Sequence, residues 1–92
     1  MTHVPSQVDF FEEHTNAAER AVIAGILSDP NGFEQAGLTG SHFFNPHHGS
    51  IWEAIGSLRA RGQDVDAVAV GNVLGGRLES VGGMTYISGL MV

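Results

Sequence analysis

The sequence predicts an all-α fold, a compact orthogonal bundle of five or six short helices. Apolar residues recur at helical spacing in several separate segments, and each of these segments is short. Glycine or proline stands at the corners between them. Short apolar stripes joined at tight corners are typical of helices that cross at steep angles. With 92 residues and 42% hydrophobic content, the chain can form one domain with one modest core.

Residues 1–13 have no apolar period and contain Pro5, so we expect a flexible arm there and place the domain at residues 14–92. Phe10 and Phe11 are the exceptions in this arm. An adjacent aromatic pair could anchor the arm on its own domain or on a neighbouring molecule.

A first helix is predicted over residues 17–28. Asn16 and Glu19 have the spacing of a capping box. Gly25 lies inside the helix, which indicates either another helix crossing close over that point or simple tolerance of a glycine. The apolar stripe that defines the helix consists of Ala18, Val22, Ile23, Ile26 and Leu27.

A sharp corner follows this helix. Asp29-Pro30 ends it and begins a short second helix, which bears Phe33 and Ala36 and stops at Gly37. Residues 42–44, His-Phe-Phe, are long enough for one turn, and we expect both aromatic rings to pack on the core.

The central helix is the best-specified element of the sequence. Asn45 can cap its first turn, and Pro46 suits the first helical position. Gly62 can take the left-handed conformation that ends a helix, and Arg59 and Arg61 place positive charge beside the carbonyl end of the dipole. The apolar stripe of this helix consists of Ile51, Trp52, Ile55 and Leu58.

Residues 63–70 alternate imperfectly between polar and apolar side chains, so both a strand and a helix are possible there. We favour a helix. Asp66 is a good N-cap, and Val65 and Val70 hold the two positions of a hydrophobic staple, with helical spacing continuing to Gly75.

Residues 78–81 can form one turn, and a last helix follows Gly82-Gly83. It ends the chain at Val92 without a glycine, a basic residue or a polar tail, so we expect the chain to be a fragment of a longer protein. The apolar stripe of this helix would then need a cover. We therefore expect an interface between molecules at Met84, Ile87, Leu90 and Met91, with Phe10 and Phe11.

The charge of the chain limits its chemistry. The net charge is −6, lysine is absent, and the fixed cations are Arg20, Arg59, Arg61 and Arg77. Four scattered arginines do not make the clustered patch that binds nucleic acid. Without a Gly-Lys-Ser/Thr sequence, the glycine-rich residues 71–76 cannot work as a phosphate-binding loop.

Cysteine is also absent, which excludes disulfides and thiolate zinc sites and makes a reducing cytoplasm the expected location. The apolar runs are too short to cross a bilayer, and the N-terminus lacks the pattern of a signal peptide. We expect no membrane role.

Two groups of residues could support chemistry. His42, His47 and His48 resemble metal ligands, but adjacent histidines on a helix diverge, and a hydrogen bond to backbone near a helix start is the more ordinary role. Asp64 and Asp66 could form an acid–base pair, although turn and cap positions explain both. We expect no catalytic residue, metal or cofactor in this chain.

The order of motifs resembles the N-terminal domain of replicative DNA helicases of the DnaB type over residues 14–92. Departures from the family pattern occur at Ala17, Ala24 and Val65. The matching stretches are Ala18-Glu19-Arg20-Ala21-Val22-Ile23-Ala24-Gly25 to the family's Ala-Glu-x-x-Val-Leu-Gly, Phe43-Phe44 to Phe-Tyr, His48-Gly49-Ser50-Ile51-Trp52-Glu53-Ala54-Ile55 to His-x-x-Ile-Phe-x-Ala-Ile, Arg61-Gly62-Gln63-Asp64-Val65-Asp66 to Arg-Gly-x-Pro-x-Asp, and Gly82-Gly83-Met84-Thr85-Tyr86-Ile87 to Gly-Gly-x-x-Tyr-Leu.

This resemblance implies a non-catalytic head domain that pairs with copies of itself in the collar of a hexameric ring, where primase and helicase loader proteins dock. It also implies a RecA-like ATPase domain beyond residue 92, and ATP and Mg²⁺ are expected only there. Two other hypotheses stay open, a free-standing helical adaptor or regulator related to the helicase head and a small metal-dependent enzyme using the histidines. The origin of the chain in a host, phage or plasmid also stays open.

Overall fold

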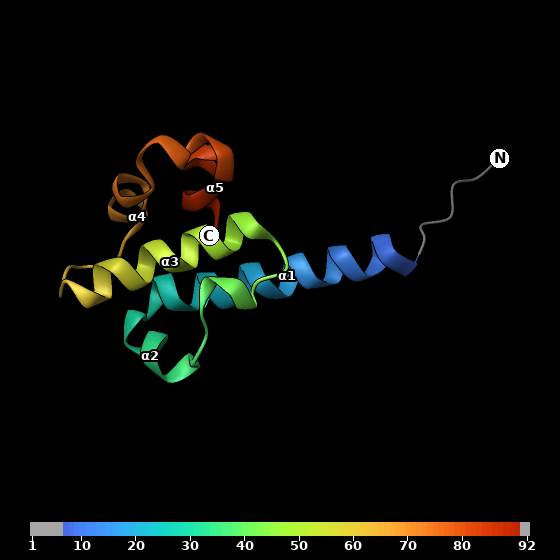
Figure 1. Cartoon of the computed structure of the whole chain (residues 1–92), viewed down its shortest axis with the longest axis horizontal. Helices are drawn as coiled ribbons and strands as arrows, with labels where there is room; N and C mark the ends of the chain where they lie inside the picture. Colours follow the sequence, from blue (N-terminus) through green and yellow to red (C-terminus); the bar gives the residue numbers. More distant parts are fainter. Residues whose placement is uncertain (1–6, 91–92) are drawn as a thin grey trace.

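The computed structural model describes residues 7–90, and the side chains of residues 12–90. Within these residues the fold is all-helical and without strands, which confirms the predicted class (Figure 1). Five α-helices are joined through four 3₁₀ turns. In chain order the elements are α1 Gln7–Ser28, η1 Pro30–Gly32, α2 Phe33–Ala36, η2 Gly40–His42, α3 Pro46–Ala60, α4 Ala67–Leu74, η3 Gly75–Arg77, η4 Glu79–Val81 and α5 Gly83–Gly89.

Helix α3 is the centre of the fold, as its start and stop signals predicted. Its N-cap Asn45 accepts a hydrogen bond from the backbone N–H of His47 at 2.9 Å, and Gly62 has a φ of +68° just after its end. The other elements surround it, with α1 and α2 on one side and α4 and α5 on the other (Figure 1). Its buried residues are His48, Gly49, Ile51, Trp52, Ala54, Ile55 and Leu58.

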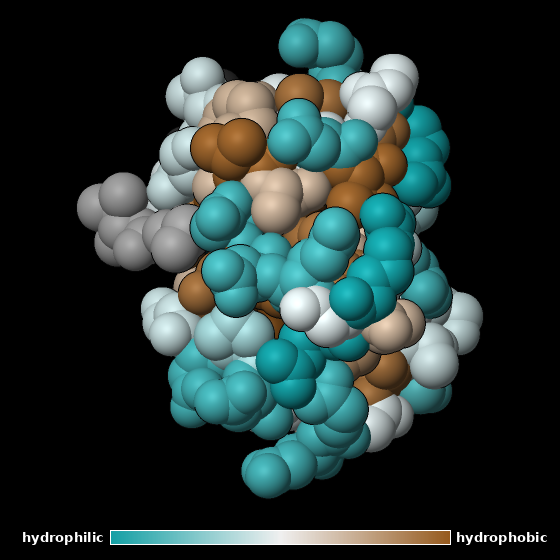
Figure 2. Space-filling model, turned by 90° about the vertical axis from the view of Figure 1, so that its left-hand side faces the viewer, coloured by the Kyte–Doolittle hydropathy of each residue, from teal (hydrophilic) through white to brown (hydrophobic). Residues whose placement is uncertain are grey.

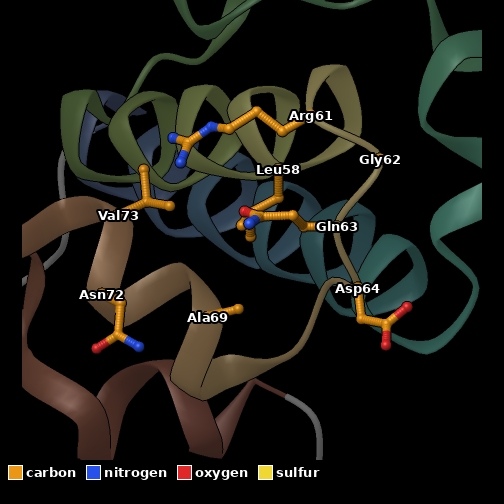
Figure 3. A pocket seen from close by; sticks show the side chains of 8 residues that line it. All are labelled: Leu58, Arg61, Gly62, Gln63, Asp64, Ala69, Asn72 and Val73. Carbon is orange, nitrogen blue, oxygen red and sulfur yellow. The ribbon is translucent and has the colours of Figure 1, made fainter.

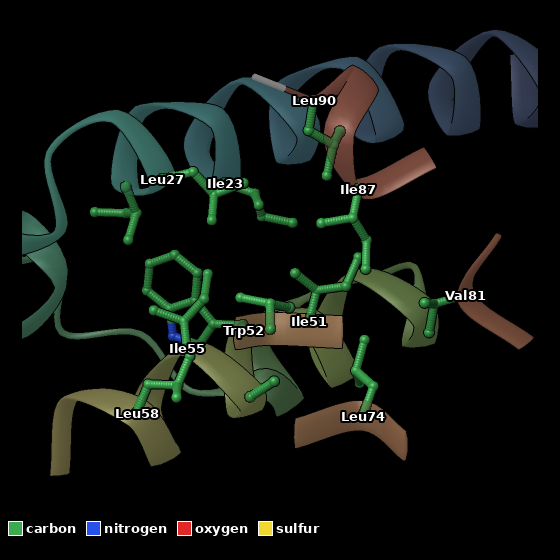
Figure 4. Close-up of a cluster of buried hydrophobic side chains, with 13 residues drawn as sticks. Ile23, Leu27, Ile51, Trp52, Ile55, Leu58, Leu74, Val81, Ile87 and Leu90 are labelled. Carbon is green, nitrogen blue, oxygen red and sulfur yellow. The ribbon is translucent and has the colours of Figure 1, made fainter. Parts of the chain in front are cut away.

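The core lies where α1, α3, α4 and α5 meet (Figure 4). Trp52 is buried at 1% exposure, and its ring packs at 4.8 Å from the ring of Phe33 and 5.2 Å from that of Phe43. Its indole N–H donates to the carbonyl of Leu38 at 2.9 Å, so the one polar atom of this side chain is satisfied. The buried apolar residues are Ile23, Ile26, Leu27, Ile51, Trp52, Ala54, Ile55, Leu58, Val70, Leu74, Val81, Ile87 and Leu90.

Helix α1 is longer than predicted. It begins at Gln7, so residues 7–13 of the predicted arm are helical, and Asn16 lies inside the helix instead of capping it. The N-terminal half extends beyond the other helices (Figure 1), and the described molecule measures 54 × 27 × 23 Å. Phe10 and Phe11 belong to this helix, but their side chains lie outside the described ones.

The structure decides two smaller points. Of the two alternatives for Gly25, simple tolerance is the one that holds, because a Cβ placed there would have no described atom within 4 Å. Phe43 packs against the core, but Phe44 is 55% exposed. The second of the two aromatic rings therefore does not belong to the core.

Residues 67–74 form a helix and not a strand, as the capping signals favoured. The Asp66 side chain accepts a hydrogen bond from the backbone N–H of Ala69 at 2.8 Å, and Gly75 follows the helix with a φ of +56°. Val70 of the predicted staple is fully buried, and Val65 packs against the same core.

Candidate docking surface

A buried polar network connects α1, α3 and α5. The Glu19 carboxylate accepts hydrogen bonds from the backbone N–H groups of Phe44 at 2.5 Å and Asn45 at 3.2 Å. It also accepts one from Nδ1 of His48 at 2.9 Å. The side-chain oxygen of Asn16, about one turn before Glu19 on α1, accepts a hydrogen bond from the side-chain amide of Asn45 at 3.0 Å. Polar residues on α1 therefore hold the loop that leads into α3.

His48 connects this network to α5 through a hydrogen bond. Its ring is fully buried, and its Nε2 lies 2.6 Å from the hydroxyl of Tyr86. Because a carboxylate can only accept, Nδ1 carries the proton toward Glu19, and in the neutral ring Nε2 accepts the Tyr86 proton. Both nitrogens have partners, so the imidazole is satisfied without solvent.

This network explains why three of the motifs belong together. Glu19, His48 and Tyr86 each come from a separate matching stretch, and the fold brings them into one hydrogen-bonded chain. All three side chains are used in holding helices to one another. We therefore interpret the arrangement as a structural clamp.

The other histidines do not join His48. His42 Nδ1 accepts from the backbone N–H of Thr39 at 2.9 Å at the start of η2, the kind of role expected for one histidine of this cluster. His47 is exposed. Among the described residues no group of three or more histidines or acids is placed to hold a metal ion.

The two aspartates have separate positions. Asp66 caps α4, as expected. Asp64 lies at the rim of a hollow beside α4, and no hydrogen bond joins it to Asp66 within the described part of the chain. The pair therefore does not form the shared carboxylate site that acid–base chemistry would need.

That hollow is a well-defined concave feature of the described surface. It has a volume of about 730 Å³ and lies between the C-terminal end of α3 and helix α4 (Figure 3). Its apolar part comes from Leu58, Ala69 and Val73. Its polar rim comes from Arg61, Gly62, Gln63, Asp64 and Asn72.

Helix α4 adds an apolar surface next to the hollow. Val68 is 64% exposed, the most exposed large hydrophobic side chain among the described residues. Figure 2 views the molecule from the left-hand side of Figure 1. Hydrophobic side chains gather on the upper part of this face, where α4 lies, and hydrophilic ones dominate below. The hollow and α4 together are called the α4 surface here.

Two residues of the predicted interface on α5 are buried in their own molecule. Ile87 is fully buried and Leu90 is 8% exposed, because the stripe of α5 packs on the core of its own molecule. Met84 is half-buried, and its sulfur occupies the space over Gly71. Met91 lies outside the described residues, as do the side chains of Phe10 and Phe11.

The α4 surface was not identified from the sequence. The sequence does contain a signal for it, because Ala67–Leu74 has one polar side chain, Asn72. A helix that is apolar on every side cannot bury all of its sides in a core this small.

No helix within the described residues is long and apolar enough to cross a membrane.

Comparisons with known proteins agree on one family. Residues 12–92 match the family model of the DnaB-like helicase N terminal domain. The replicative DNA helicase DnaB of Mycobacterium leprae (strain TN) is 32% identical over 97 aligned positions, which cover 99% of this chain and 16% of that protein. The crystal structure of the N-terminal domain of DnaB helicase from Mycobacterium tuberculosis superimposes with a TM-score of 0.76 at 33% identity, covering 82% of this chain and 57% of that one. The chain thus spans about a sixth of the length of the curated relative.

Proposed function

The chain belongs to the DnaB-like helicase N-terminal domain family, and on that premise we propose that it works as a non-catalytic assembly and docking head of a hexameric replicative DNA helicase. In this role it pairs with copies of itself in the collar of the ring, and primase and a helicase loader dock on it. Its place of action is the cytoplasm, at the replication fork.

The observation that supports this most strongly is the agreement of fold and sequence over nearly the whole chain. The match to the Mycobacterium tuberculosis domain has a TM-score of 0.76 at 33% identity. The buried clamp of Glu19, His48 and Tyr86 adds an independent argument, because it uses the motif residues to build a scaffold and leaves the surface free for binding.

The division of labour follows from the charges and motifs. The chain has no lysine for a Walker-type phosphate loop, and its four cations stand against ten carboxylates, which argues against binding of nucleotide phosphates or a DNA backbone. ATP and Mg²⁺ therefore belong to a RecA-like domain that we place beyond residue 92. DNA contact by the ring is assigned to the same part.

Two observations test the proposal together. We expect the gene to encode a Gly-Lys-Ser/Thr phosphate loop downstream of Val92. We expect the isolated chain to bind purified primase from the same cell in size-exclusion chromatography while showing no ATP hydrolysis of its own. A gene that ends without an ATPase domain, together with a chain that binds no primase, would instead support the free-standing adaptor.

A further inference from the structure

The corner between α1 and α2 carries an asparagine followed by a glycine. Asn31 and Gly32 lie in η1, the single 3₁₀ turn that joins these two helices. Asn31 is exposed and lines a small hollow of about 310 Å³ between η1 and the end of α3. Because glycine has no Cβ, nothing on Gly32 shields its backbone nitrogen from the side-chain amide of the residue before it. That amide carbon is therefore open to attack by the Gly32 nitrogen.

The backbone of the turn does not require a glycine at position 32. Gly32 has a φ of −78° and a ψ of −7°, in the right-handed helical region that other residues adopt freely. A Cβ placed there would meet a methyl group of Ile26 at 3.5 Å, which is ordinary van der Waals contact. Gly37, which ends α2, differs because its φ of +66° favours glycine. The fold therefore accepts a side chain at position 32, and the glycine changes chiefly the access to Asn31.

The hydrogen bonding of η1 makes the turn easy to open. The Gly32 N–H donates to the carbonyl of Asp29 at 3.2 Å, which is at the long end of the usual range. The turn is three residues long, and its N-cap Asp29 makes no side-chain hydrogen bond to it. A single turn lacks the cooperativity of a long helix. The Gly32 nitrogen is therefore released when one weak hydrogen bond breaks.

The other three asparagines of the chain are held or shielded. Asn16 lies inside α1, and its side-chain oxygen accepts a hydrogen bond from Asn45 at 3.0 Å. Asn45 is followed by a proline, whose nitrogen has no hydrogen to lose. Asn72 lies inside α4 and is followed by a β-branched valine, which crowds the backbone nitrogen. Asn31 is therefore the asparagine whose surroundings permit the reaction.

We propose that Asn31 is a site of spontaneous deamidation, a property that does not depend on the proposed function. The Gly32 backbone nitrogen loses its proton and attacks Cγ of Asn31. The new nitrogen–carbon bond closes a succinimide ring, and the side-chain nitrogen leaves as ammonia. Water then adds to the ring. Opening at the side-chain carbonyl gives aspartate, and opening at the backbone carbonyl gives isoaspartate, in which the main chain runs through the former side chain.

Isoaspartate at position 31 disturbs the attachment of α2 to α3. It lengthens the main chain inside η1, where the hydrogen bond from the Gly32 N–H to Asp29 spans this residue. Phe33 follows directly after the turn, and its ring packs 4.8 Å from the ring of the buried Trp52. The aspartate product keeps the normal main chain and adds only a carboxylate to the hollow. The isoaspartate form should therefore be the less stable of the two products.

Ageing the folded chain at mildly alkaline pH and mapping its peptides by mass spectrometry tests the reaction. We expect Asn31 to convert, with isoaspartate as the main product, while Asn16 and Asn72 stay amides. In urea, where the turn is absent, conversion should be about two- to ten-fold faster, the factor that corresponds to one backbone hydrogen bond. Gly32→Ala is the matched control, because the fold accepts a Cβ there. It should melt close to the parent and deamidate several-fold more slowly.

The effect on α2 is measured on the separated products. The isoaspartate form should melt below the fresh chain and below Asn31→Asp, which carries the same added charge on a normal main chain. The proposal is overturned if Asn31 of the folded chain stays unchanged while the chain in urea converts completely. It is also overturned if Asn16 or Asn72 converts first, if Gly32→Ala deamidates as fast as the parent, or if the isoaspartate form melts like Asn31→Asp.

Discussion

His48 is the residue through which three helices are held together. It is fully buried. Its Nδ1 is hydrogen-bonded to the Glu19 carboxylate of α1, and its Nε2 to the Tyr86 hydroxyl of α5. A buried polar group costs free energy only when a partner is missing, so the clamp is sensitive to the removal of either neighbour.

Tyr86→Phe tests this clamp with the smallest possible change. The ring stays, but Nε2 of His48 loses its partner at 2.6 Å. We expect the free energy of unfolding to fall by about 1 to 3 kcal/mol, the usual cost of leaving a buried polar atom unsatisfied. Denaturant unfolding measures it, with Thr85→Ala at the exposed neighbouring position as the control. Equal stability of Tyr86→Phe and the parent would show that the network holds nothing.

Trp52→Ala tests the core itself. It removes a side chain that is 1% exposed, together with its contacts to Phe33 and Phe43. We expect a loss of about 3 to 5 kcal/mol, enough to unfold most of a domain of this size. Thermal melting followed by circular dichroism measures it, and Val68→Ala, at a 64% exposed position, should melt close to the parent. A mild effect of Trp52→Ala would mean that α3 faces the wrong way.

Residue by residue, the sequence predicts what local chemistry decides. Asn45 and Asp66 cap their helices because the partner of each cap lies within three residues. Glu19 does not take its predicted role in a capping box with Asn16. Its partners Asn45 and His48 lie 26 and 29 residues along the chain, where local spacing gives no information. No local pattern distinguishes a carboxylate that caps its own helix from one that reaches another element.

At the scale of elements, α1 differs most from expectation. A continuous helix from Gln7 stands where the sequence predicted an arm, because extending a helix that is already formed costs far less than nucleating a new one. Glu12, Glu13 and His14 are exposed on it.

Glu13→Pro tests the length of α1. Proline interrupts a helix interior but is accepted in a first turn, so the helix should restart near residue 13. We expect the helical signal in the far-ultraviolet spectrum to decrease while the melting temperature changes little. Ala24→Pro, in the half of α1 that packs on the core, should cost about 3 kcal/mol or more. An unchanged spectrum for Glu13→Pro would place the start of α1 after residue 13.

The pair between α2 and α3 predicts a dependence on pH. Arg59 donates two hydrogen bonds to Glu34, and these hold the pKa of the Glu34 carboxyl below its ordinary value of 4.5. A depressed carboxyl pKa gives stability that is present above the ordinary pKa and is lost as the pH falls through the folded-state value. The melting temperature should therefore exceed that of Glu34→Gln at neutral pH by a small margin, because the pair is exposed. The margin should close in acid and shrink at high salt. A gap that persists in acid would assign the effect to packing.

Helix α5 shows where periodicity stops being informative. The spacing of Ile87 and Leu90 correctly predicts a helix with one apolar stripe, but a stripe does not say whether its cover is the same molecule or another. Here the cover is the core of the same molecule. The most exposed large apolar side chain of the described residues, Val68, is on α4, where Asn72 is the one polar side chain.

At the scale of the whole molecule, the described chain is a scaffold in which His48 is buried within a hydrogen-bonded network. Its most exposed large apolar side chain among the described residues, Val68, lies on α4. Because Ile87 and Leu90 are buried in their own molecule, these two side chains are not exposed for pairing between copies. With a net charge of −6 on each copy, repulsion opposes pairing, and salt should strengthen it where the contact is apolar.

Self-association most directly distinguishes a head of a helicase ring from a free-standing adaptor. Sedimentation equilibrium should be run on the chain alone, and on the chain extended by the residues that its gene encodes after Val92, each at low and high salt. We predict a weak monomer–dimer equilibrium that tightens with salt and with the extension, since closed two-fold pairs are the commonest assembly. A strict monomer at high micromolar concentration in both proteins and at both salt concentrations would contradict a role in the collar of a hexameric helicase.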